Sequence, residues 1–527
     1  MKKLCKRFPL AAVLLLVLLC VAPVLLFRDF SPANELRYLS IADEALADGH
    51  WFAFSNHGEP YADKPPLYLW IVMLCRLFFG RHSMFVLSLL SLLPAFGIVA
   101  VMDRWAYKNK SPLTRASAAA MLLTTALFLG MAVYVRMDML MCLWIVLAIY
   151  SYWEGKIGWF GFFTFLALFT KGPVGLLVPP LSVAVYLVAT GNARDLGKTF
   201  GWKFWAVLGG LSLAWLAGAY FEGGVDYLWN LTVHQTVGRA VNSFHHQAPF
   251  WFYLVTVWGV AAPWCLLTIP GLAASFFDRK ETGSRRTRRE RLFAWTVVVT
   301  LVMLSLFSSK LALYLLPVLP FLTALFVRVE KRLGWCLWMR VALGVITAVF
   351  ALIGMAAMAG YFFFDRLPVP VDYGFARTPL LLPAGALLLA GSVYAFCGLR
   401  RGWERPVLAL SVALLLTAAV MSPLVPRVNE VIGYGQLCEE IRRAAPSGEV
   451  YAVGLVRPEN MDVYLHRPVT PIDPEAFAQD PSLIPAGAVV VLDETEDAAA
   501  SCRYSSILSE SGRHLKESSA GRYGIWF

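Results

Sequence analysis

Ionisable side chains are dense in residues 32–70, which directly follow the first hydrophobic segment of the chain. Carboxylates and cations held between two apolar blocks are groups that can meet a charged headgroup at a membrane surface. We therefore expect a site for a charged ligand in this first loop. Its charged residues include Glu35, Arg37, Asp43, Glu44, Asp48, Asp63 and Lys64.

Other ionisable residues recur at the ends of later apolar runs. Charges near membrane depth are costly and usually line a cavity or pathway. Lys and Arg donate charge-assisted hydrogen bonds to phosphate oxygens, so an anion site is predicted where such cations meet. Each cation alone is also typical of a side chain that reaches for lipid headgroups. The set comprises Arg136, Asp138, Lys171, His234, Arg239, His245, His246, Lys310 and Tyr314, with Lys64 from the first loop.

The composition indicates a helical protein that crosses a membrane many times. The 527 residues are 58% hydrophobic and 15% charged, against roughly 45–50% and about 25% in soluble domains. The apolar residues form repeated runs near the ~20-residue length that spans a bilayer. The net charge of +11 lies mainly in short loops between these runs, where it orients the chain. This distribution argues against nucleic acid as a partner.

The alternation of basic loops predicts about thirteen spans, with the N-terminus inside and the C-terminus outside. We interpret the first run as an uncleaved helix, because no A-x-A-like cleavage site follows it. Segment 66–80 is too short to span and is predicted to lie at the interface. The predicted spans are 9–27, 83–103, 115–134, 138–153, 158–171, 173–190, 203–222, 251–274, 293–308, 311–328, 337–363, 379–397 and 406–424.

The C-terminal residues 425–527 differ in composition from the membrane domain, which we assign to 1–424 with outer loops 28–82 and 223–250. A helix is predicted at 435–445, followed by short β-rich runs that include V-Y-L-H-R-P-V and A-V-V-V-L-D. This pattern predicts a small α/β domain outside the membrane. Cys438 and Cys502 either pair there in an oxidising compartment or remain buried thiols.

Six motifs, in this order, resemble the bacterial aminoarabinose lipid A transferase family, which is related to the protein O-mannosyltransferases. They are P-A-N-E-L-R-Y, Y-A-D-K-P-P-L, V-R-M-D, F-T-K-G-P-V, H-H-Q-A-P-F-W-F-Y and S-S-K-L-A-L-Y-L-L-P, within residues 9–425. The resemblance implies the GT-C architecture and sugar transfer from a polyprenyl-phosphate donor, with no required cofactor. It also implies that Lys64, Arg239 and Tyr314 hold the donor phosphate. Asp63 and His234 fall where the family can bind a divalent metal.

One departure from the family pattern bears on the chemistry. The first-loop motif usually carries Asp-Glu, whereas this chain has Asn34-Glu35. An amide cannot act as a general base, so a hydroxyl acceptor would have to lose its proton to Glu35 or Asp138. A phosphate monoester acceptor is already anionic and needs no base. The substitution therefore favours a phosphate acceptor or moves the base to a neighbouring residue.

These observations lead to the hypothesis of an inner-membrane glycosyltransferase. It would pass a sugar from a polyprenyl-phosphate carrier to lipid A or another cell-envelope glycolipid at the outer face of the membrane. Two alternatives remain open at this point. One is glycosylation of protein Ser/Thr hydroxyls, and the other is a transporter or flippase for polyprenyl phosphate. The transporter is less favoured because the chain shows none of the repeated halves that are frequent in such proteins.

Overall fold

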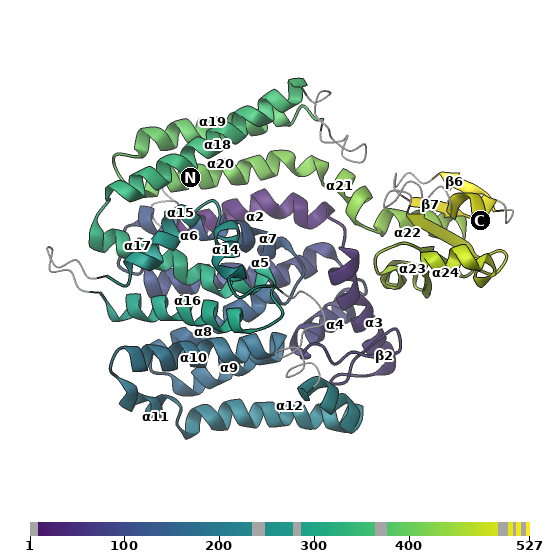
Figure 1. The fold of residues 1–527 in the computed structure, drawn as a ribbon, viewed down its shortest axis with the longest axis horizontal. Coiled ribbons are helices and arrows are strands. Elements are labelled where there is room, and N and C mark those ends of the chain that lie inside the picture. The colour runs from purple at the N-terminus through teal and green to yellow at the C-terminus, as the bar shows by residue number, and fades with distance from the viewer. Residues whose placement is uncertain are drawn as a thin grey trace.

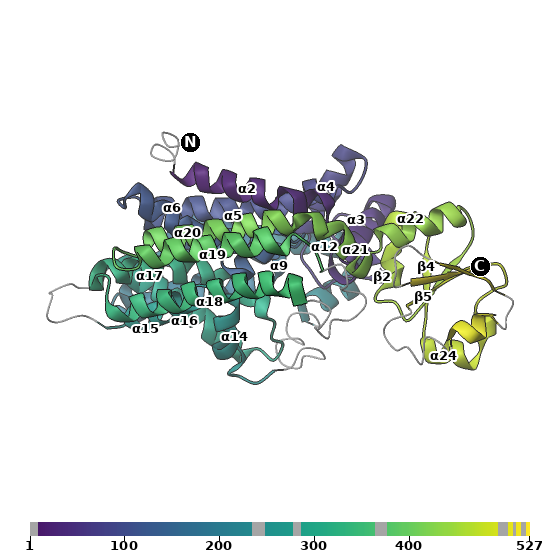
Figure 2. The same ribbon diagram turned by 90° about the horizontal axis from the view of Figure 1, so that it is seen from above.

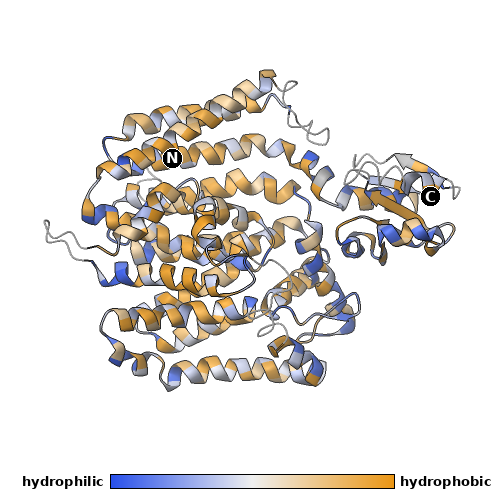
Figure 3. Cartoon of the chain, viewed as in Figure 1, coloured by the Kyte–Doolittle hydropathy of each residue, from blue (hydrophilic) through white to orange (hydrophobic). Residues whose placement is uncertain are grey.

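The computed structural model describes residues 9–233, 248–277, 286–363, 377–493, 504–509, 513–517 and 523–527. A bundle of long helices forms the main body, and a small domain with a sheet lies at one end of it (Figures 1 and 2). Apolar residues dominate the bundle, whereas polar residues gather at its ends and in the small domain (Figure 3). This distribution is that of a multi-pass membrane protein with a domain outside the bilayer.

The first half of the bundle contains the outer loop and its neighbours. Its elements are α2 (Pro9–Phe27), η1 (Pro32–Leu36), α3 (Arg37–Asp48), β1 (Ser55–Asn56), β2 (Glu59–Pro60), α4 (Leu67–Phe79), α5 (Met84–Ala106), α6 (Pro112–Leu123), α7 (Ala126–Val133), α8 (Asp138–Trp153), α9 (Ile157–Lys171) and α10 (Pro173–Ala189). The second half contains η2 (Ala193–Asp195), α11 (Leu196–Thr199), α12 (Trp202–Trp229), α14 (Phe252–Val260), α15 (Cys265–Ala274), α16 (Arg288–Leu306), η5 (Ala312–Val318), α17 (Leu319–Leu333), α18 (Leu337–Phe363), α19 (Leu381–Gly398) and α20 (Glu404–Met421).

Every predicted span corresponds to a helix or to a broken helix. Among the described residues, seven helices are long and apolar enough to cross a membrane, or eight if the bent pair α6 and α7 is one span. The predicted spans at α8, α9, α10 and α15 are present as shorter apolar helices. The predicted interfacial segment is α4, whose 13 residues fall short of the ~20 needed to span.

The predicted span 115–134 is not one straight helix, because the chain bends by 72° between α6 and α7. Thr124 and Thr125 turn their hydroxyls back to the carbonyls of Ala120 and Met121. The N–H of Ala126 then leaves the helix ladder and donates to the carbonyl of Ala262, 2.7 Å away. Two adjacent threonines that bond to preceding carbonyls are a recognised cause of helix bending.

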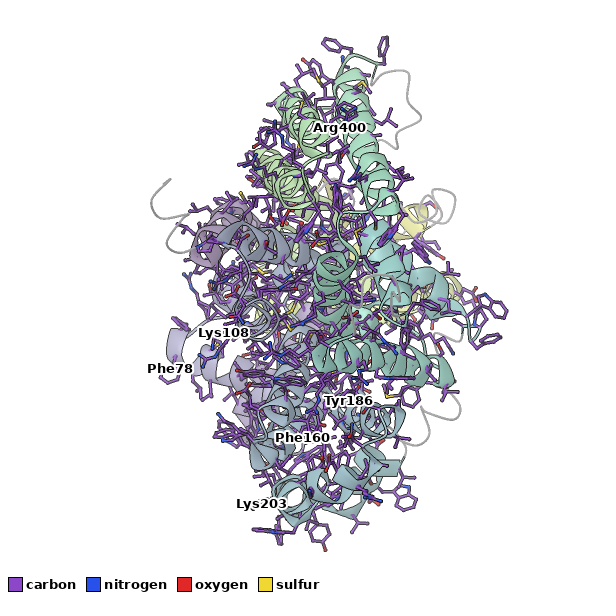
Figure 4. The ribbon with its side chains drawn as sticks, turned by 90° about the vertical axis from the view of Figure 1, so that its left-hand side faces the viewer. Phe78, Lys108, Phe160, Tyr186, Lys203 and Arg400 are labelled. Carbon is purple, nitrogen blue, oxygen red and sulfur yellow. The ribbon has the colours of Figure 1, made fainter. Side chains whose placement is uncertain are left out.

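The basic loops gather at the end of the bundle opposite the small domain. Figure 4 views the molecule from this end and labels Lys108, Lys203 and Arg400, which belong to the loop after α5, the start of α12 and the loop after α19. The first outer loop and the small domain lie together at the other end (Figure 1). The structure thus segregates the basic loops as the predicted topology requires.

The C-terminal domain confirms the predicted α/β fold. Its sheet has the order β4-β3-β5-β7-β6, in which β3 is parallel to β4 and β5, and β7 is antiparallel to β5 and β6. The elements are α21 (Val425–Ile432), α22 (Gly435–Ala444), β3 (Val450–Val453), η9 (Pro458–Met461), α23 (Asp462–Leu465), β4 (Val469–Ile472), α24 (Pro474–Gln479), η10 (Pro481–Leu483), β5 (Val489–Asp493), β6 (Leu515–Glu517) and β7 (Tyr523–Trp526).

Two details of this domain bear on the sequence predictions. The run V-Y-L-H-R-P-V was predicted as a strand, but its first half belongs to helix α23 and the strand begins only at Val469. A segment as short as the four residues of α23 shows no apolar periodicity that distinguishes a helical turn from a strand. Cys438 is a buried free thiol, and Cys502 lies outside the described residues.

Candidate functional site

Glu35 is a buried residue of the first outer loop that connects several segments through hydrogen bonds. It lies in the π-helical turn η1, its side chain is 0% exposed, and its carboxylate accepts four hydrogen bonds. Arg28 donates two of them at 2.6 and 2.7 Å. The backbone N–H groups of Ser31 and Val135 donate the others, each at 2.7 Å. Glu35 therefore ties the end of α2 and the outer loop to the turn between α7 and α8.

This arrangement bears on the prediction that Glu35 or Asp138 would take the proton if the acceptor were a hydroxyl. An ionised carboxylate offers about four lone-pair sites, and here four donors occupy them. The side chain has no exposed surface through which a substrate hydroxyl could approach. Glu35 holds the loop in place, and its sequence neighbour Asn34 is the residue that contacts the charged cluster described next.

A network of charged and polar groups joins four predicted site residues. The Asp138 carboxylate is fully buried and accepts from Arg136 Nε at 2.8 Å and from the Lys171 ammonium. The same ammonium lies 4.8 Å from the centroid of the Tyr314 ring. Arg136 Nη1 donates to the Asn34 amide oxygen at 3.2 Å. We call Asn34, Arg136, Asp138, Lys171 and Tyr314 the central cluster.

Helix ends place the two oppositely charged members of this cluster. Asp138 is the first residue of α8, where a carboxylate complements the positive end of the helix dipole. Lys171 is the last residue of α9, where a cation complements the negative end. Because α8 and α9 are consecutive and pack side by side, the start of one meets the end of the other. The same position makes Asp138 a counter-ion between two cations, and its conditional role as a base stays a prediction.

Lys64 brings a further cation to this region. Its ammonium donates to the Asp63 carboxylate at 2.8 Å and to the Asp63 carbonyl at 3.2 Å, and its charge acts on Lys171. Pro65 and Pro66 follow and lead into α4. Two prolines remove the N–H donors and restrict the backbone just before the helix, so the K-P-P motif holds Lys64 at a fixed entry to α4.

Three residues near the cluster were not assigned a role from the sequence. The Arg37 guanidinium lies 5.8 Å from the ring centroids of both Tyr38 and Tyr61. Burial raises the pKa of Tyr38, and it raises the pKa of Tyr68 well above its ordinary value, so both hydroxyls are neutral donors at pH 7. Tyr68 closely follows the K-P-P motif, as the second residue of α4, and this nearness in sequence to Lys64 is the signal that could have identified it.

Lys310 does not join the central cluster. Its side chain is buried, and its ammonium donates to the Phe307 carbonyl at 2.6 Å. Phe307 is the residue that directly follows α16, so Lys310 caps this helix. Among the remaining predicted residues, His234, Arg239, His245 and His246 lie outside the described residues.

The predicted metal site has one described member. The Asp63 carboxylate pairs with Lys64, and the described part of the chain holds no group of three His, Cys, Asp or Glu side chains suited to a metal ion. A cation at 2.8 Å from the carboxylate competes with a metal for the same oxygens. The metal stays a prediction, and no chemical step below depends on it.

Among the residues that the structure describes, cations outnumber carboxylates around the central cluster. The cations are Lys64, Arg136 and Lys171, with Arg37 beside Tyr38 and Tyr61, and the carboxylates are Asp63 and Asp138, while Arg28 neutralises Glu35. Several buried or half-buried cations that lie close together favour the binding of an anion. Phosphate suits them because its oxygens accept several charge-assisted hydrogen bonds at once. The arrangement can therefore bind a phosphate group where the outer loop meets the ends of α8 and α9.

Known proteins resemble this chain in sequence and in fold. No family model matches the chain. Curated relatives named undecaprenyl phosphate-alpha-4-amino-4-deoxy-L-arabinose arabinosyl transferase are 26% identical in Enterobacter sp. (strain 638), 27% in Sodalis glossinidius and 28% in Pseudomonas aeruginosa. The matches cover 66%, 68% and 74% of this chain and 65%, 64% and 71% of those relatives. For the first two, the match thus spans slightly under two thirds of the relative's length.

Solved structures support the fold over nearly the whole chain. The crystal structure of ArnT from Cupriavidus metallidurans bound to undecaprenyl phosphate matches with a TM-score of 0.75 at 19% identity, covering 98% of this chain and 97% of that one. The apo form of the same protein matches with a TM-score of 0.68, covering 98% and 96%. The fold is that of a multi-pass GT-C membrane protein. The chain is similar in sequence to the curated arabinosyl transferases, in agreement with the resemblance predicted from its motifs.

Proposed function

We propose that the protein is a membrane glycosyltransferase that uses an undecaprenyl-phosphate-linked sugar as donor and lipid A or another envelope glycolipid as acceptor. The observation that carries the proposal is the buried central cluster with Lys64 beside it, where the cations exceed the carboxylates. The curated relatives bear the name of an undecaprenyl phosphate-dependent transferase. The solved ArnT structure, a fold match, contains undecaprenyl phosphate.

The reaction is a displacement at the anomeric carbon of the sugar. The bond from that carbon to the lipid phosphate oxygen breaks, and the phosphate leaves with its negative charge. Lys64, Lys171 and Arg136 stabilise this growing charge, while Tyr314 lies against the Lys171 ammonium and fixes its direction. Asp138 keeps the two cluster cations in place before the donor binds.

The acceptor proposed here is a phosphate. Asn34 has no basic group, the Glu35 carboxylate is saturated with donors, and Asp138 lies between two cations. None of these three predicted catalytic residues is placed to remove a proton from a hydroxyl. A phosphate monoester such as that of lipid A attacks through an oxygen that is already anionic, so it requires no base.

Incubation of the purified protein with a radiolabelled undecaprenyl-phosphate sugar should move the label into lipid A. Lipid A lacking its phosphates is the matched control acceptor and should take up none. Label in protein Ser or Thr would support the O-glycosyltransferase alternative instead. Donor binding without product in detergent, where no compartments exist, would support the carrier alternative.

The proposed location of the site is the periplasmic face of the inner membrane. A reporter active only outside the cytoplasm should give signal when fused after Phe527 and none when inserted at Gly283. The reason is that basic loops remain inside, and they gather at the end of the bundle opposite the C-terminal domain. The reverse pattern would place the central cluster in the cytoplasm and contradict the proposed donor and acceptor.

A further inference from the structure

The C-terminal domain contacts the same turn that carries Asn34 and Glu35. Asn460 of η9 is fully buried, and its amide Nδ2 donates to the carbonyl of Pro32 at 3.0 Å. Pro32 is the first residue of the turn η1. A buried side-chain amide from the C-terminal domain therefore fixes the start of the turn whose third residue, Asn34, contacts Arg136.

Asp29 makes a second connection. Its carboxylate accepts from the N–H of Gly435 at 2.6 Å and from the Tyr464 hydroxyl, and its own N–H donates to Asn429 Oδ1 at 2.9 Å. The neighbouring residue Arg28 forms the ion pair with Glu35. The C-terminal domain thus holds Asp29, and the adjacent residue Arg28 pairs with Glu35.

Glycine is required where the C-terminal domain meets Asp29. A Cβ added to Gly433 would lie 2.3 Å from the Asp29 carboxylate oxygen, and one added to Gly435 would lie 2.8 Å from it. Real Cβ atoms do not approach other heavy atoms so closely. The V-I-G-Y-G-Q sequence therefore allows the backbone to approach Asp29 in a way that a side chain at either glycine would prevent.

Apolar packing joins the two parts as well. One hydrophobic cluster contains Phe30, Leu36 and Leu39 of the outer loop together with Leu437, Ile441 and Met461 of the C-terminal domain. The strands present alternate residues to this cluster, namely Val450, Ala452, Val489 and Val491. The opposite face of the sheet packs in a separate cluster that includes Val453, Val490 and Leu492.

A cavity of about 750 Å³ lies at the same boundary, lined by residues that include Ser40, His57, Asp462 and His466. Ser40 Oγ donates to Asp462 Oδ2 at 2.7 Å, and His57 Nδ1 lies 3.7 Å from the same carboxylate oxygen. Polar contacts between the outer loop and the C-terminal domain therefore continue beyond the turn η1.

From these contacts we infer that the C-terminal domain positions the residues of the site. Asn460 of this domain and Asp29 of the outer loop are the positioning residues. They hold the Asn34-Glu35 turn where Asn34 meets Arg136 and where Arg28 meets Glu35. Neither residue contacts the cations proposed to bind the donor phosphate. Their loss should therefore slow the chemical step while leaving the donor's affinity nearly unchanged. This inference rests on the proposed function for its activity measurement but not for its structural one.

The test compares two changes within the full-length protein. Asn460→Ala removes the donor to Pro32, whereas Val490→Ala shortens a core residue on the far face of the sheet, away from the outer loop. Both should lower the thermal midpoint. Only Asn460→Ala should lower kcat, by up to about 10²-fold for a displacement of about 1 Å, with the donor KM changed by less than about threefold. Amide hydrogen exchange of residues 28–40 should increase in Asn460→Ala alone.

Gly433→Ala is the second variant, since it displaces Asp29 without touching Asn460, and it should show the same loss of kcat and the same faster exchange. Equal kcat and equal exchange in Asn460→Ala and Val490→Ala would overturn the inference. Absence of transfer in the wild-type protein would refute the proposed function. The exchange comparison would then still decide whether the C-terminal domain holds the turn.

Discussion

Replacement of Lys64 by methionine is expected to lower sugar transfer by about 10²–10³-fold, the usual cost of losing one preorganised donor to a developing negative charge. Methionine keeps most of the length of the lysine side chain but cannot donate to a phosphate oxygen. Lys64 lies on the first outer loop beside Asp63, so the helices of the bundle should form as before. Turnover at saturating donor, measured with labelled carrier lipid, gives the comparison.

Lys198→Met is the matched control for this change. Lys198 of α11 pairs with Asp195 of η2 and is 85% exposed, far along the chain from the first outer loop. It should leave turnover unchanged. Lys64→Arg should keep part of the rate, because it retains the charge with a different donor geometry. Near wild-type turnover in Lys64→Met would show that this lysine only contacts lipid headgroups.

The central cluster could be predicted in part because its members carry chemical signals at helix ends. Asp138 and Lys171 stand where carboxylates and cations favour the termini of helices, and the predicted topology placed both termini on one side of the membrane. The structure brings these ends together as an ion pair. Lys310 had the same signal, but it caps the end of α16 instead. Residue type cannot separate these outcomes, because a helix-end lysine serves either purpose.

The role of Glu35 could not be predicted, because its partners are mostly backbone groups. Two of its four hydrogen bonds come from the N–H groups of Ser31 and Val135, and a backbone N–H has no signature in the sequence. The π-helical turn η1 brings the Glu35 carboxylate to the Ser31 N–H. Such turns are rare, and no simple sequence periodicity predicts them. Arg28 was visible as a charge, but only the fold shows that it faces Glu35.

The link to Asn460 was hidden by distance along the chain. Asn460 and Pro32 are 428 residues apart, and the composition of residues 425–527 suggested a domain with its own core. The sheet does have such a core on its far face. The near face packs in one cluster with the outer loop. Alternating apolar residues in a strand indicate a buried face but do not say which partner buries it.

Glu35→Gln is expected to destabilise the protein, not to remove a base. The glutamine NH₂ group would replace one of the two acceptor oxygens, and each oxygen faces Arg28 and a backbone N–H donor. Breaking a buried ion pair on one side costs about 3–5 kcal/mol of unfolding free energy. Denaturation of Glu35→Gln in detergent should show a loss of this size, and the fraction that remains folded should transfer sugar with a flat rate from about pH 6.5 to 8.

Arg28→Met provides the partner for a double-mutant cycle. The double variant should be less destabilised than the sum of the single changes by about 0.5–3 kcal/mol, because neither charge is then left buried without the other. Complete recovery is not expected, since one of the N–H groups of Ser31 and Val135 still loses its acceptor oxygen. One other result would change the assigned acceptor from a phosphate to a hydroxyl. If Glu35→Gln kept its stability but lost about 10²–10⁴-fold in rate, Glu35 would be the base and the acceptor a hydroxyl.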